Sequence, residues 1–288
     1  RLAQEGAAGI VISGRRVELG QAAAAQIRAL GTECHYVRAD VGRADDCAAL
    51  MGEAIAQLGT VNALVNSAAT TDRGSLLDTT LEMWQAQMDI NARGPFLLMQ
   101  ALVRHLLERQ AAGSIVNILS QSAHCGQSFL VPYSASKATL ANLTKNVAQS
   151  FRAQRIRCNG IMAGWMDTPG EAAIQKKAHN APADWLAKAE AGRPMGQLAK
   201  PDELAGLVSY LLSPESGVMT GALVDYDQWV PGAQPECIRS PQEICHGKRR
   251  RLRRRPHRPH PRRQRRCAAR REPALRLRPG GRQRRQPG

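Results

Sequence analysis

The sequence predicts an α/β fold built on a doubly wound parallel sheet with helices on both faces. Short apolar runs alternate with amphipathic stretches of about 10 to 15 residues, which is the pattern of strands alternating with crossover helices. The runs are almost continuously apolar, as parallel strands buried on both faces are. Glycine follows several of the amphipathic stretches, where it favours a helix end. With 288 residues, the chain is long enough for one large domain or two.

The first third of the chain predicts a helix end followed by three strands and two helices. Residues 1–6 combine helix formers with a closing Gly6, which is typical of a last helical turn with glycine at the C-terminal cap. The next segments are predicted, in order, as strand, helix, strand, helix and strand: 9–13, 16–30, 34–39, 45–58 and 61–66. Gly31 and Gly59 close the two helices.

The alternation continues to the last predicted strand. Residues 81–108 form one long helical stretch, and Gly94-Pro95 inside it predicts a kink or a boundary. The later segments are predicted as strand, helix, strand, irregular helical region, helix and strand: 114–120, 135–152, 156–162, 170–192, 201–212 and 222–225. At least six strands are thus separated by helices, and such a fold binds ligands at the carboxyl ends of its strands.

The basic charge of the chain is confined to its C-terminal tail. Residues 234–288 hold 20 of the 40 Lys and Arg residues but only 3 of the 24 Asp and Glu residues. The body, 1–233, is nearly neutral and gives no electrostatic reason to expect nucleic acid or an anionic membrane as a partner. The tail is rich in Arg and Pro and poor in aliphatic side chains, so we expect it to be disordered. Two interpretations stay open: an out-of-frame reading of a GC-rich gene, or a nucleic-acid-binding arm.

The cysteines and the hydropathy pattern predict a cytoplasmic body. Seven cysteines without a C-x-x-C pair argue against a disulfide framework or a zinc site. Four of them are interpreted as small core residues: Cys34, Cys47, Cys125 and Cys158. No apolar run approaches the ~18 residues needed to span a bilayer, and no signal peptide opens the chain.

The segment Tyr133-Ser-Ala-Ser-Lys137 is the main candidate for chemistry. On a helix the phenol and the ammonium would lie on one face, one turn apart. A phenol titrates near pH 10, and a nearby cation favours the phenolate, so Lys137 could lower the pKa of Tyr133 toward neutrality. Ser120, thirteen residues earlier, could hold a substrate oxygen beside the phenol. Alone, Tyr-x-x-x-Lys also describes an ordinary solvated surface pair.

Together with their neighbours these residues resemble a classical short-chain dehydrogenase/reductase, from Arg1 to about Trp229. Ser120, Tyr133 and Lys137 match the catalytic serine and the Y-x-x-x-K pair of that family, and Asn91 matches the asparagine of its tetrad. The family's C-terminal L-L-S and T-G motifs have counterparts near residues 211–221. The resemblance implies a Rossmann-type, three-layer fold and hydride transfer between a nicotinamide cofactor and a secondary alcohol or carbonyl.

The resemblance also implies a set of cofactor-binding residues besides Tyr133 and Lys137. Asp40 and Val41 match the D-V that meets the adenine ring, and Asn66 with Ala68 stands where the family has N-N-A-G. Gly164 and Thr168 lie in a segment similar to the one near the nicotinamide. For Asp40 a helix N-cap is an alternative or additional role. Asn66 could instead satisfy backbone groups beside the cofactor.

Three further residues near Tyr133 are weaker candidates. Ser122 is a rival to Ser120 but lies only eleven residues before Tyr133. His124 and Trp165 could line a substrate pocket or serve in packing.

The sequence departs from the family at the phosphate-binding loop. The T-G-x-x-x-G-x-G loop, which should precede a helix end like 1–6, has no counterpart here. We therefore expect roughly 20 residues, the first strand and its loop, to be absent from this chain. That strand belongs in the middle of the sheet, so cofactor binding and independent folding would suffer. Two departures are milder: Ala163 stands where the family usually has proline, and Gln228-Trp229 stands where it usually has Gly-Gly.

The end of the second family strand predicts the cofactor. NAD-preferring relatives place an acidic residue there, whereas this chain reads Ser13-Gly14-Arg15-Arg16. Two guanidiniums and no carboxylate favour the 2′-phosphate of NADP, with NAD as the second choice. Alternatively, both arginines only open the next helix and stay in water.

Three functional classes follow. The first is an NAD(P)-dependent oxidoreductase acting on a small-molecule alcohol or carbonyl, with a lean to a sugar or polyol because residues 170–192 are polar. The second is a truncated, catalytically impaired family member, and the third is nucleic-acid binding through the tail. The resemblance also implies a homo-oligomer, commonly joined through the helices that carry Asn91 and Lys137. In the mechanism it implies, Tyr133 transfers the proton, Lys137 holds the nicotinamide ribose, and Asn91 supports a water that relays protons.

Overall fold

A computed structural model describes residues 1–124 and 126–231. Within them the six predicted strands are all present: β1 (Gly9–Gly14), β2 (Glu33–Arg38), β3 (Ala63–Asn66), β4 (Gly113–Ile118), β5 (Ile156–Ala163) and β6 (Leu223–Tyr226). The predictions for Cys125 and for the basic tail, 234–288, lie outside the described residues.

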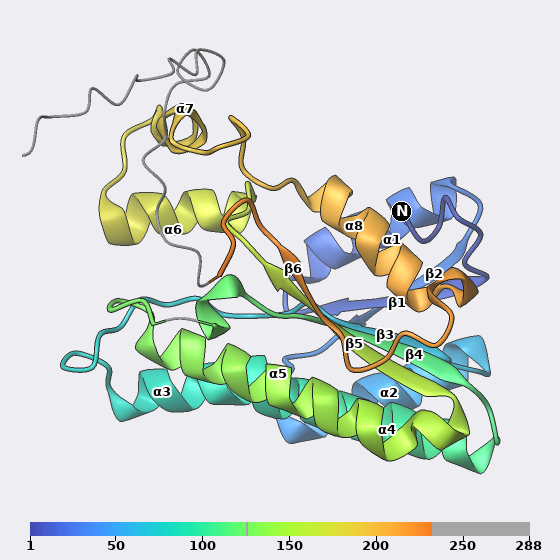
Figure 1. The fold of residues 1–288 in the computed structure, drawn as a ribbon. Helices are drawn as coiled ribbons and strands as arrows, with labels where there is room; N and C mark the ends of the chain where they lie inside the picture. The colour runs from blue at the N-terminus through green and yellow to red at the C-terminus, as the bar shows by residue number, and fades with distance from the viewer. Residues whose placement is uncertain (125, 232–288) are drawn as a thin grey trace, which may run out of the picture. The chain divides into compact units, whose positions relative to one another are not determined.

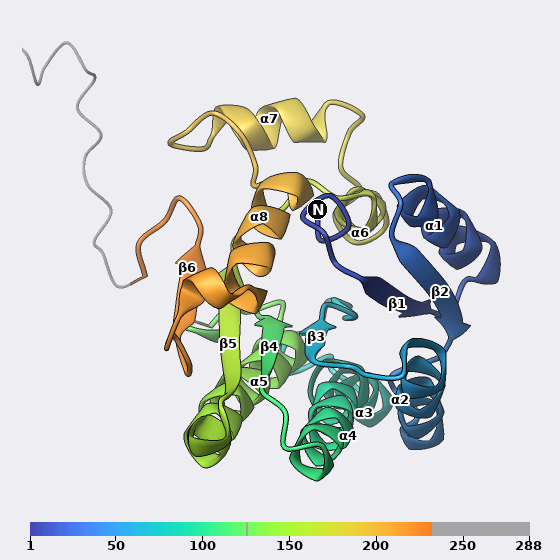
Figure 2. The same cartoon turned by 90° about the vertical axis from the view of Figure 1, so that its right-hand side faces the viewer.

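Every strand pair in the described part of the chain is parallel, but the strands form two sheets. The first has the order β1-β2 and the second the order β3-β4-β5-β6. The predicted parallel, Rossmann-type α/β fold is therefore confirmed. The division into two sheets agrees with the prediction that a strand from the middle of the sheet is absent from this chain. No hydrogen-bonded pairing joins β1 to β3 among these residues. Figure 2 shows the two strands apart from each other, each in its own sheet.

Eight α-helices accompany the strands in the described ranges: α1 (Val17–Ala29), α2 (Ala44–Leu58), α3 (Leu81–Met88), α4 (Gly94–Glu108), α5 (Val131–Phe151), α6 (Pro169–His179), α7 (Trp185–Ala191) and α8 (Pro201–Leu212). Figures 1 and 2 show α2, α4 and α5 on one face of the strands and α1 and α8 on the other. This arrangement is the three-layer, Rossmann-like α/β architecture. Helices α6 and α7 follow the carboxyl end of β5.

The predicted boundary at Gly94-Pro95 is a π-helical turn, Asp89–Arg93, between α3 and α4. Pro95 has no N–H to donate to the carbonyl four residues earlier, and its ring crowds that carbonyl, so the α-helical register cannot continue. Instead the N–H of Gly94 donates to Asp89 O, five residues back. Such turns inside helices often occur at functional sites.

Two further predicted boundaries concern the start of the chain and the helix of Tyr133. Gly6 has φ +86°, and the N–H groups of Gly6 and Ala7 donate to Ala3 O and Leu2 O, so residues 1–7 close as a helical turn with a glycine cap. Helix α5 begins at Val131, earlier than the predicted residue 135. Pro132 lies in its first turn, where proline needs no donor and favours the start of a helix. Tyr133 therefore lies within the helix.

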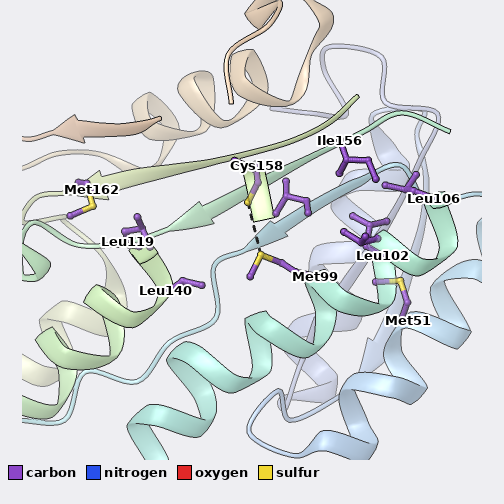
Figure 3. Close-up of a cluster of buried hydrophobic side chains, with 13 residues drawn as sticks. Met51, Met99, Leu102, Leu106, Leu119, Leu140, Ile156, Cys158 and Met162 are labelled. Atoms are coloured by element: carbon purple, nitrogen blue, oxygen red, sulfur yellow. Dashed lines mark hydrogen bonds between the residues drawn. The ribbon is translucent and has the colours of Figure 1, made fainter. Parts of the chain in front are cut away.

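The largest buried cluster lies between the β3–β6 sheet and helices α4 and α5 (Figure 3). Leu102, Leu106 and Ile115 have no exposed surface. Cys158 points into this cluster, and its Sγ lies 4.0 Å from Met99 Sδ. Burial raises the pKa of the Cys158 thiol to about 12, so it stays protonated. The interpretation as core residues is confirmed for Cys34, Cys47 and Cys158.

In the part of the chain that the structure describes, none of the helices is both long and apolar enough to cross a bilayer. The same residues contain no group of three or more His, Cys, Asp or Glu arranged to hold a metal ion.

Candidate active site

Apart from Asn91, Tyr133 and Lys137, which lie on helical segments, the sequence-predicted site residues lie at or after the carboxyl ends of five strands. Arg15 and Arg16 follow β1, Asp40 and Val41 follow β2, Asn66 ends β3 and Ala68 comes after it. Ser120 follows β4, and Gly164 and Thr168 follow β5. In a parallel α/β fold these ends lie on one side of the strands, where ligands bind.

Tyr133 and Ser120 meet through their hydroxyl groups. A hydrogen bond between the two side chains lowers the pKa of Tyr133, but burial of the phenol has the larger effect and raises it. The residue as a whole keeps part of its surface in solvent. The positive charge of Arg73 also lowers this pKa, and the negative charge of Glu171 raises it. The phenol is therefore protonated at neutral pH in this structure.

Lys137 lies beneath the tyrosine, with only 2% of its surface exposed. Its Nζ donates a hydrogen bond of 2.7 Å to Ile118 O and lies 5.9 Å from the centre of the Tyr133 ring. Burial lowers the pKa of Lys137 to about 8. We expected Lys137 to lower the pKa of Tyr133, yet the groups that do so here are Ser120 and Arg73.

Asn91 is fully buried in the π-helical turn and joins two parts of the site. Its Oδ1 accepts from Thr70 N and its Nδ2 donates to Thr70 O, both at 2.9 Å. Nδ2 also donates to Ser136 Oγ at 3.0 Å, and Ser136 Oγ donates to Tyr133 O. Asn91 thus fixes the segment after β3 against the first turn of α5.

Asn66 at the end of β3 takes part in a buried polar chain. Its Nδ2 donates to Asn117 Oδ1 on β4 at 2.8 Å, and Asn117 Nδ2 donates to Thr144 Oγ1 on α5 at 2.8 Å. From the sequence we expected Asn66 to bind backbone groups near the cofactor, whereas its hydrogen-bond partner in the structure is the Asn117 side chain. These hydrogen bonds between side chains hold β3, β4 and α5 together.

The arginines after β1 are exposed, whereas Asp40 and Val41 after β2 are half-buried. Arg15 keeps 67% of its side chain exposed, and its Nη1 approaches Asp40 Oδ2 only to 4.0 Å. Arg16 is exposed and is the N-cap residue of α1. The suggestion that Asp40 caps a helix is wrong, because the N-cap residue of α2 is Arg43. Asp40 Oδ1 instead accepts from Gly42 N, two residues on, in a local turn.

Gly164, Thr168 and Val41 have close contacts with their surroundings, whereas the structure records none for Ala68 among the residues that it describes. Gly164 packs so tightly on Asp227 that a Cβ would lie 2.4 Å from the carboxyl carbon, which accounts for glycine there. Thr168 caps α6, its Oγ1 accepting from Glu171 N at 3.0 Å, and its hydroxyl hydrogen can still be donated. Val41 lies against Gly94 at the start of α4, and Ala68 is exposed after β3.

The three weaker candidates have partners of their own. Ser122 Oγ donates to Ser120 Oγ at 2.9 Å, so Ser122 supports the favoured serine. His124 Nε2 pairs with Asp225 Oδ1 at 2.7 Å. Trp165 Nε1 donates to Glu171 Oε1 at 2.8 Å, which orients the indole beside α6.

Sequence reasoning missed Arg73, Glu171 and Ser136. Arg73, from the loop after β3, lies 3.5 Å from Glu171 on α6, and both charges act on the Tyr133 phenol. A charged residue closely following a strand end was the available signal for Arg73. Ser136 stands inside the Y-x-x-x-K segment, yet nothing in that spacing indicated a bond to Asn91.

Comparison with known proteins agrees with this arrangement. The family model described as Enoyl-(Acyl carrier protein) reductase matches residues 1–228. The chain is 34% identical over 227 residues to cis-4-hydroxycyclohexanecarboxylate dehydrogenase of Sinomonas cyclohexanicum, covering 78% of this chain and 87% of that protein. It is 35% identical to dehydrogenase/reductase SDR family member 4 of Oryctolagus cuniculus, with 78% and 84% covered.

A solved structure shares the fold. Gluconate 5-dehydrogenase from Burkholderia cenocepacia J2315, in complex with NADP and tartrate, superposes with a TM-score of 0.69 at 31% identity, covering 79% of this chain and 86% of that one. The matches extend over the whole described domain and include the segments that carry Ser120, Tyr133 and Lys137. The chain therefore belongs to the short-chain dehydrogenase/reductase family of NAD(P)-dependent oxidoreductases.

Proposed function

We propose that the protein transfers a hydride between NADP and a secondary alcohol or its carbonyl on a polar, hydroxylated small molecule such as a sugar or polyol. The observation that carries the proposal is the hydrogen bond between the Tyr133 and Ser120 side chains, with the buried Lys137 Nζ 5.9 Å from the centre of the Tyr133 ring. A polar substrate is supported by Arg73 and Glu171, whose charges act on the Tyr133 phenol. Relatives named for a hydroxy-carboxylate and for gluconate support the same lean.

The residues at the strand ends fit a nicotinamide dinucleotide. Arg15 and Arg16 are exposed, and the one carboxylate near Arg15 among the described residues, that of Asp40, lies 4.0 Å from its Nη1, so both guanidiniums keep donors for a 2′-phosphate. The Lys137 ammonium has three donors, and one of them is used by Ile118 O. When bound, the cofactor supplies or accepts the hydride. Our candidates for the remaining contacts with the cofactor are still Asp40, Val41, Asn66, Ala68, Gly164 and Thr168.

In the proposed mechanism the chain's own residues handle the proton. Burial raises the pKa of Tyr133, so the phenol carries the proton that a carbonyl oxygen needs on reduction. The Ser120 hydroxyl, hydrogen-bonded to the phenol, holds that oxygen in reach. The hydrogen bond from Ser120 and the positive charge of Arg73 stabilise the phenolate left behind. Lys137 is largely an ammonium at pH 7 and would hold the nicotinamide ribose. Asn91 positions these groups through Ser136, and we retain its proposed support of a proton-relaying water.

The test is transfer of deuterium from NADPH labelled at the reactive nicotinamide carbon. The full chain is incubated with ketoses, and the alcohol products are analysed by mass spectrometry. One deuterium per product supports hydride transfer, and the same reaction with NADH measures the cofactor preference. Unlabelled products, or none at any protein concentration, would refute the proposal.

We also propose that the protein acts in the cytoplasm as a homo-oligomer joined through α4 and α5. Phe96 and Leu107 on α4 each leave 41% of their surface exposed, which is apolar area that a second copy could cover. Sedimentation of the full chain tests this, and a monomer at micromolar concentration would contradict it.

A further inference from the structure

Arg73 is held at the edge of the site by a small backbone pairing. The N–H of Gly74 donates to Phe129 O at 2.9 Å, and the N–H of Val131 donates to Gly74 O at 3.0 Å. The loop after β3 is thereby joined to the segment that leads into Tyr133. The Arg73 side chain is only 17% exposed, and its guanidinium lies 5.8 Å from the centre of the Phe129 ring.

The Arg73 guanidinium is largely buried, yet its hydrogen bonds and its ion pair are long. Its Nη1 donates to Thr71 O at 3.1 Å and its Nε to His179 Nε2 at 3.3 Å. Its nearest carboxylate oxygen, on Glu171, is 3.5 Å from Nη2. Charge-assisted bonds between arginine and carboxylate are about 2.7–2.9 Å and often paired. No such paired bond to Arg73 occurs among the residues that the structure describes.

Glu171 does not depend on Arg73 for its hydrogen bonds. Its Oε1 accepts from Trp165 Nε1 at 2.8 Å and from Gln175 Nε2 at 2.7 Å. Two neutral donors thus hold the carboxylate on α6. A second carboxylate could bind the Arg73 fork without leaving Glu171 unpaired.

The pair lies within electrostatic reach of the reacting group. The charge of Arg73 lowers the pKa of Tyr133 and that of Glu171 raises it. The backbone pairing of Gly74 with Phe129 and Val131 also holds the Arg73 loop beside the segment that leads into Tyr133. A substrate whose reacting oxygen binds Tyr133 and Ser120 would thus have its remaining atoms near a guanidinium that lacks a bidentate partner among the described residues.

We infer that Arg73 determines specificity by binding a carboxylate of the substrate, so that the preferred substrates are hydroxy acids and their keto-acid counterparts. The inference rests on the proposed function and refines its polar substrate to an anionic one. A purely structural ion pair between Arg73 and Glu171 is the competing explanation. It predicts no preference for a charged substrate.

The test compares a keto acid with its methyl ester, 4-oxopentanoate and methyl 4-oxopentanoate, as substrates of the full chain with NADPH. We expect R73Q to lower kcat/KM for the acid about 10- to 100-fold and to change the ester by less than about twofold. R73K keeps the charge without the planar fork and should lose less. Equal losses for acid and ester would assign Arg73 a structural role and overturn the inference.

R193Q is the matched control, because Arg193 also lies near the site, 4.7 Å from the centre of the Trp165 ring. R193Q should leave the ratio of kcat/KM for the acid to kcat/KM for the ester unchanged. Loss of the acid preference in R193Q but not in R73Q would place the carboxylate site at Arg193 and overturn the inference.

A binding measurement separates this inference from the proposed function. The indole N–H signal of Trp165, identified by W165F, is followed by NMR while 4-oxopentanoate or its ester is added. A shift caused by the acid alone and lost in R73Q supports carboxylate binding even if neither compound is turned over. No shift with the acid in the wild-type protein, together with no acid preference in turnover, overturns it.

Discussion

The Nζ of Lys137 lies 2.7 Å from the carbonyl oxygen of Ile118, the last residue of β4. This bond fixes the first turns of α5 to the strand end that leads into Ser120. Because Tyr133 lies one turn before Lys137, the same contact sets the distance between the phenol and the serine. The lysine is thus part of the framework of the site as well as a charge beneath it.

Removing the buried ammonium should change how stability depends on pH. The pKa of Lys137 is about 8 in the folded chain and 10.5 in the reference state. Between these values the unfolded chain holds a proton that the folded chain has lost, so this group makes stability rise with pH from about 8 to about 10.5. Lys137→Met should remove that rise, measured by urea denaturation at both ends of the window. Lys145→Met, on the exposed side of the same helix, should keep it.

Asn91→Ala should destabilise the protein by roughly 1–3 kcal/mol, because it leaves buried partners at Thr70 and Ser136 without a hydrogen bond. Urea denaturation gives the change in the free energy of unfolding. Asn146→Ala on the exposed face of α5 should stay within about 0.5 kcal/mol. Equal effects of the two substitutions would show that the bonds of Asn91 carry no special weight.

Gly94→Ala should disturb the start of α4. A Cβ there would lie 2.3 Å from Val41 O, a backbone atom that cannot move aside cheaply. We expect a loss of about 1–3 kcal/mol by thermal or urea denaturation. Gly52→Ala in α2 meets no atom within 4 Å and should stabilise the chain by about 0.5–1 kcal/mol. A stabilising Gly94→Ala would mean that α4 and the loop after β2 do not pack as described.

The double substitution Arg15→Ala, Arg16→Ala should reduce the preference for NADP over NAD. Each charged hydrogen bond to the 2′-phosphate contributes about 1.5–3 kcal/mol, so kcat/KM for NADPH should fall at least about tenfold while that for NADH changes little. Arg104→Ala, at an exposed position of α4, is the control. An unchanged ratio of the two efficiencies would mean that both arginines only open α1.

The sequence predicted what depends on periodicity and on short motifs. Helix α8 begins at Pro201 and ends at Leu212 as expected, because proline and the loss of the apolar pattern mark its ends. The break between β1 and β3 was not predicted from the pattern of either strand, since pairing between strands is a long-range property. That a strand outside this chain belongs in the middle of the sheet stays a prediction.

Within the site, the Y-x-x-x-K spacing together with Ser120, Asn91 and the family motifs singled out Tyr133 and Lys137. It could not reveal the pKa of the phenol, because burial depends on the packed surroundings. Nor could it pair Arg73 with Glu171, which lie far apart in the sequence and meet only when the ends of β3 and β5 come together.

The most direct test of the account is turnover by Tyr133→Phe, which removes the hydroxyl and keeps the ring. With NADPH and a reactive carbonyl substrate, we expect kcat to fall by about 10²-fold or more, while NADPH affinity from nucleotide fluorescence stays within about twofold. Tyr210→Phe, at an exposed position of α8, should retain full activity. A Tyr133→Phe protein with kcat close to that of the wild type would contradict the assignment of Tyr133 as the proton donor.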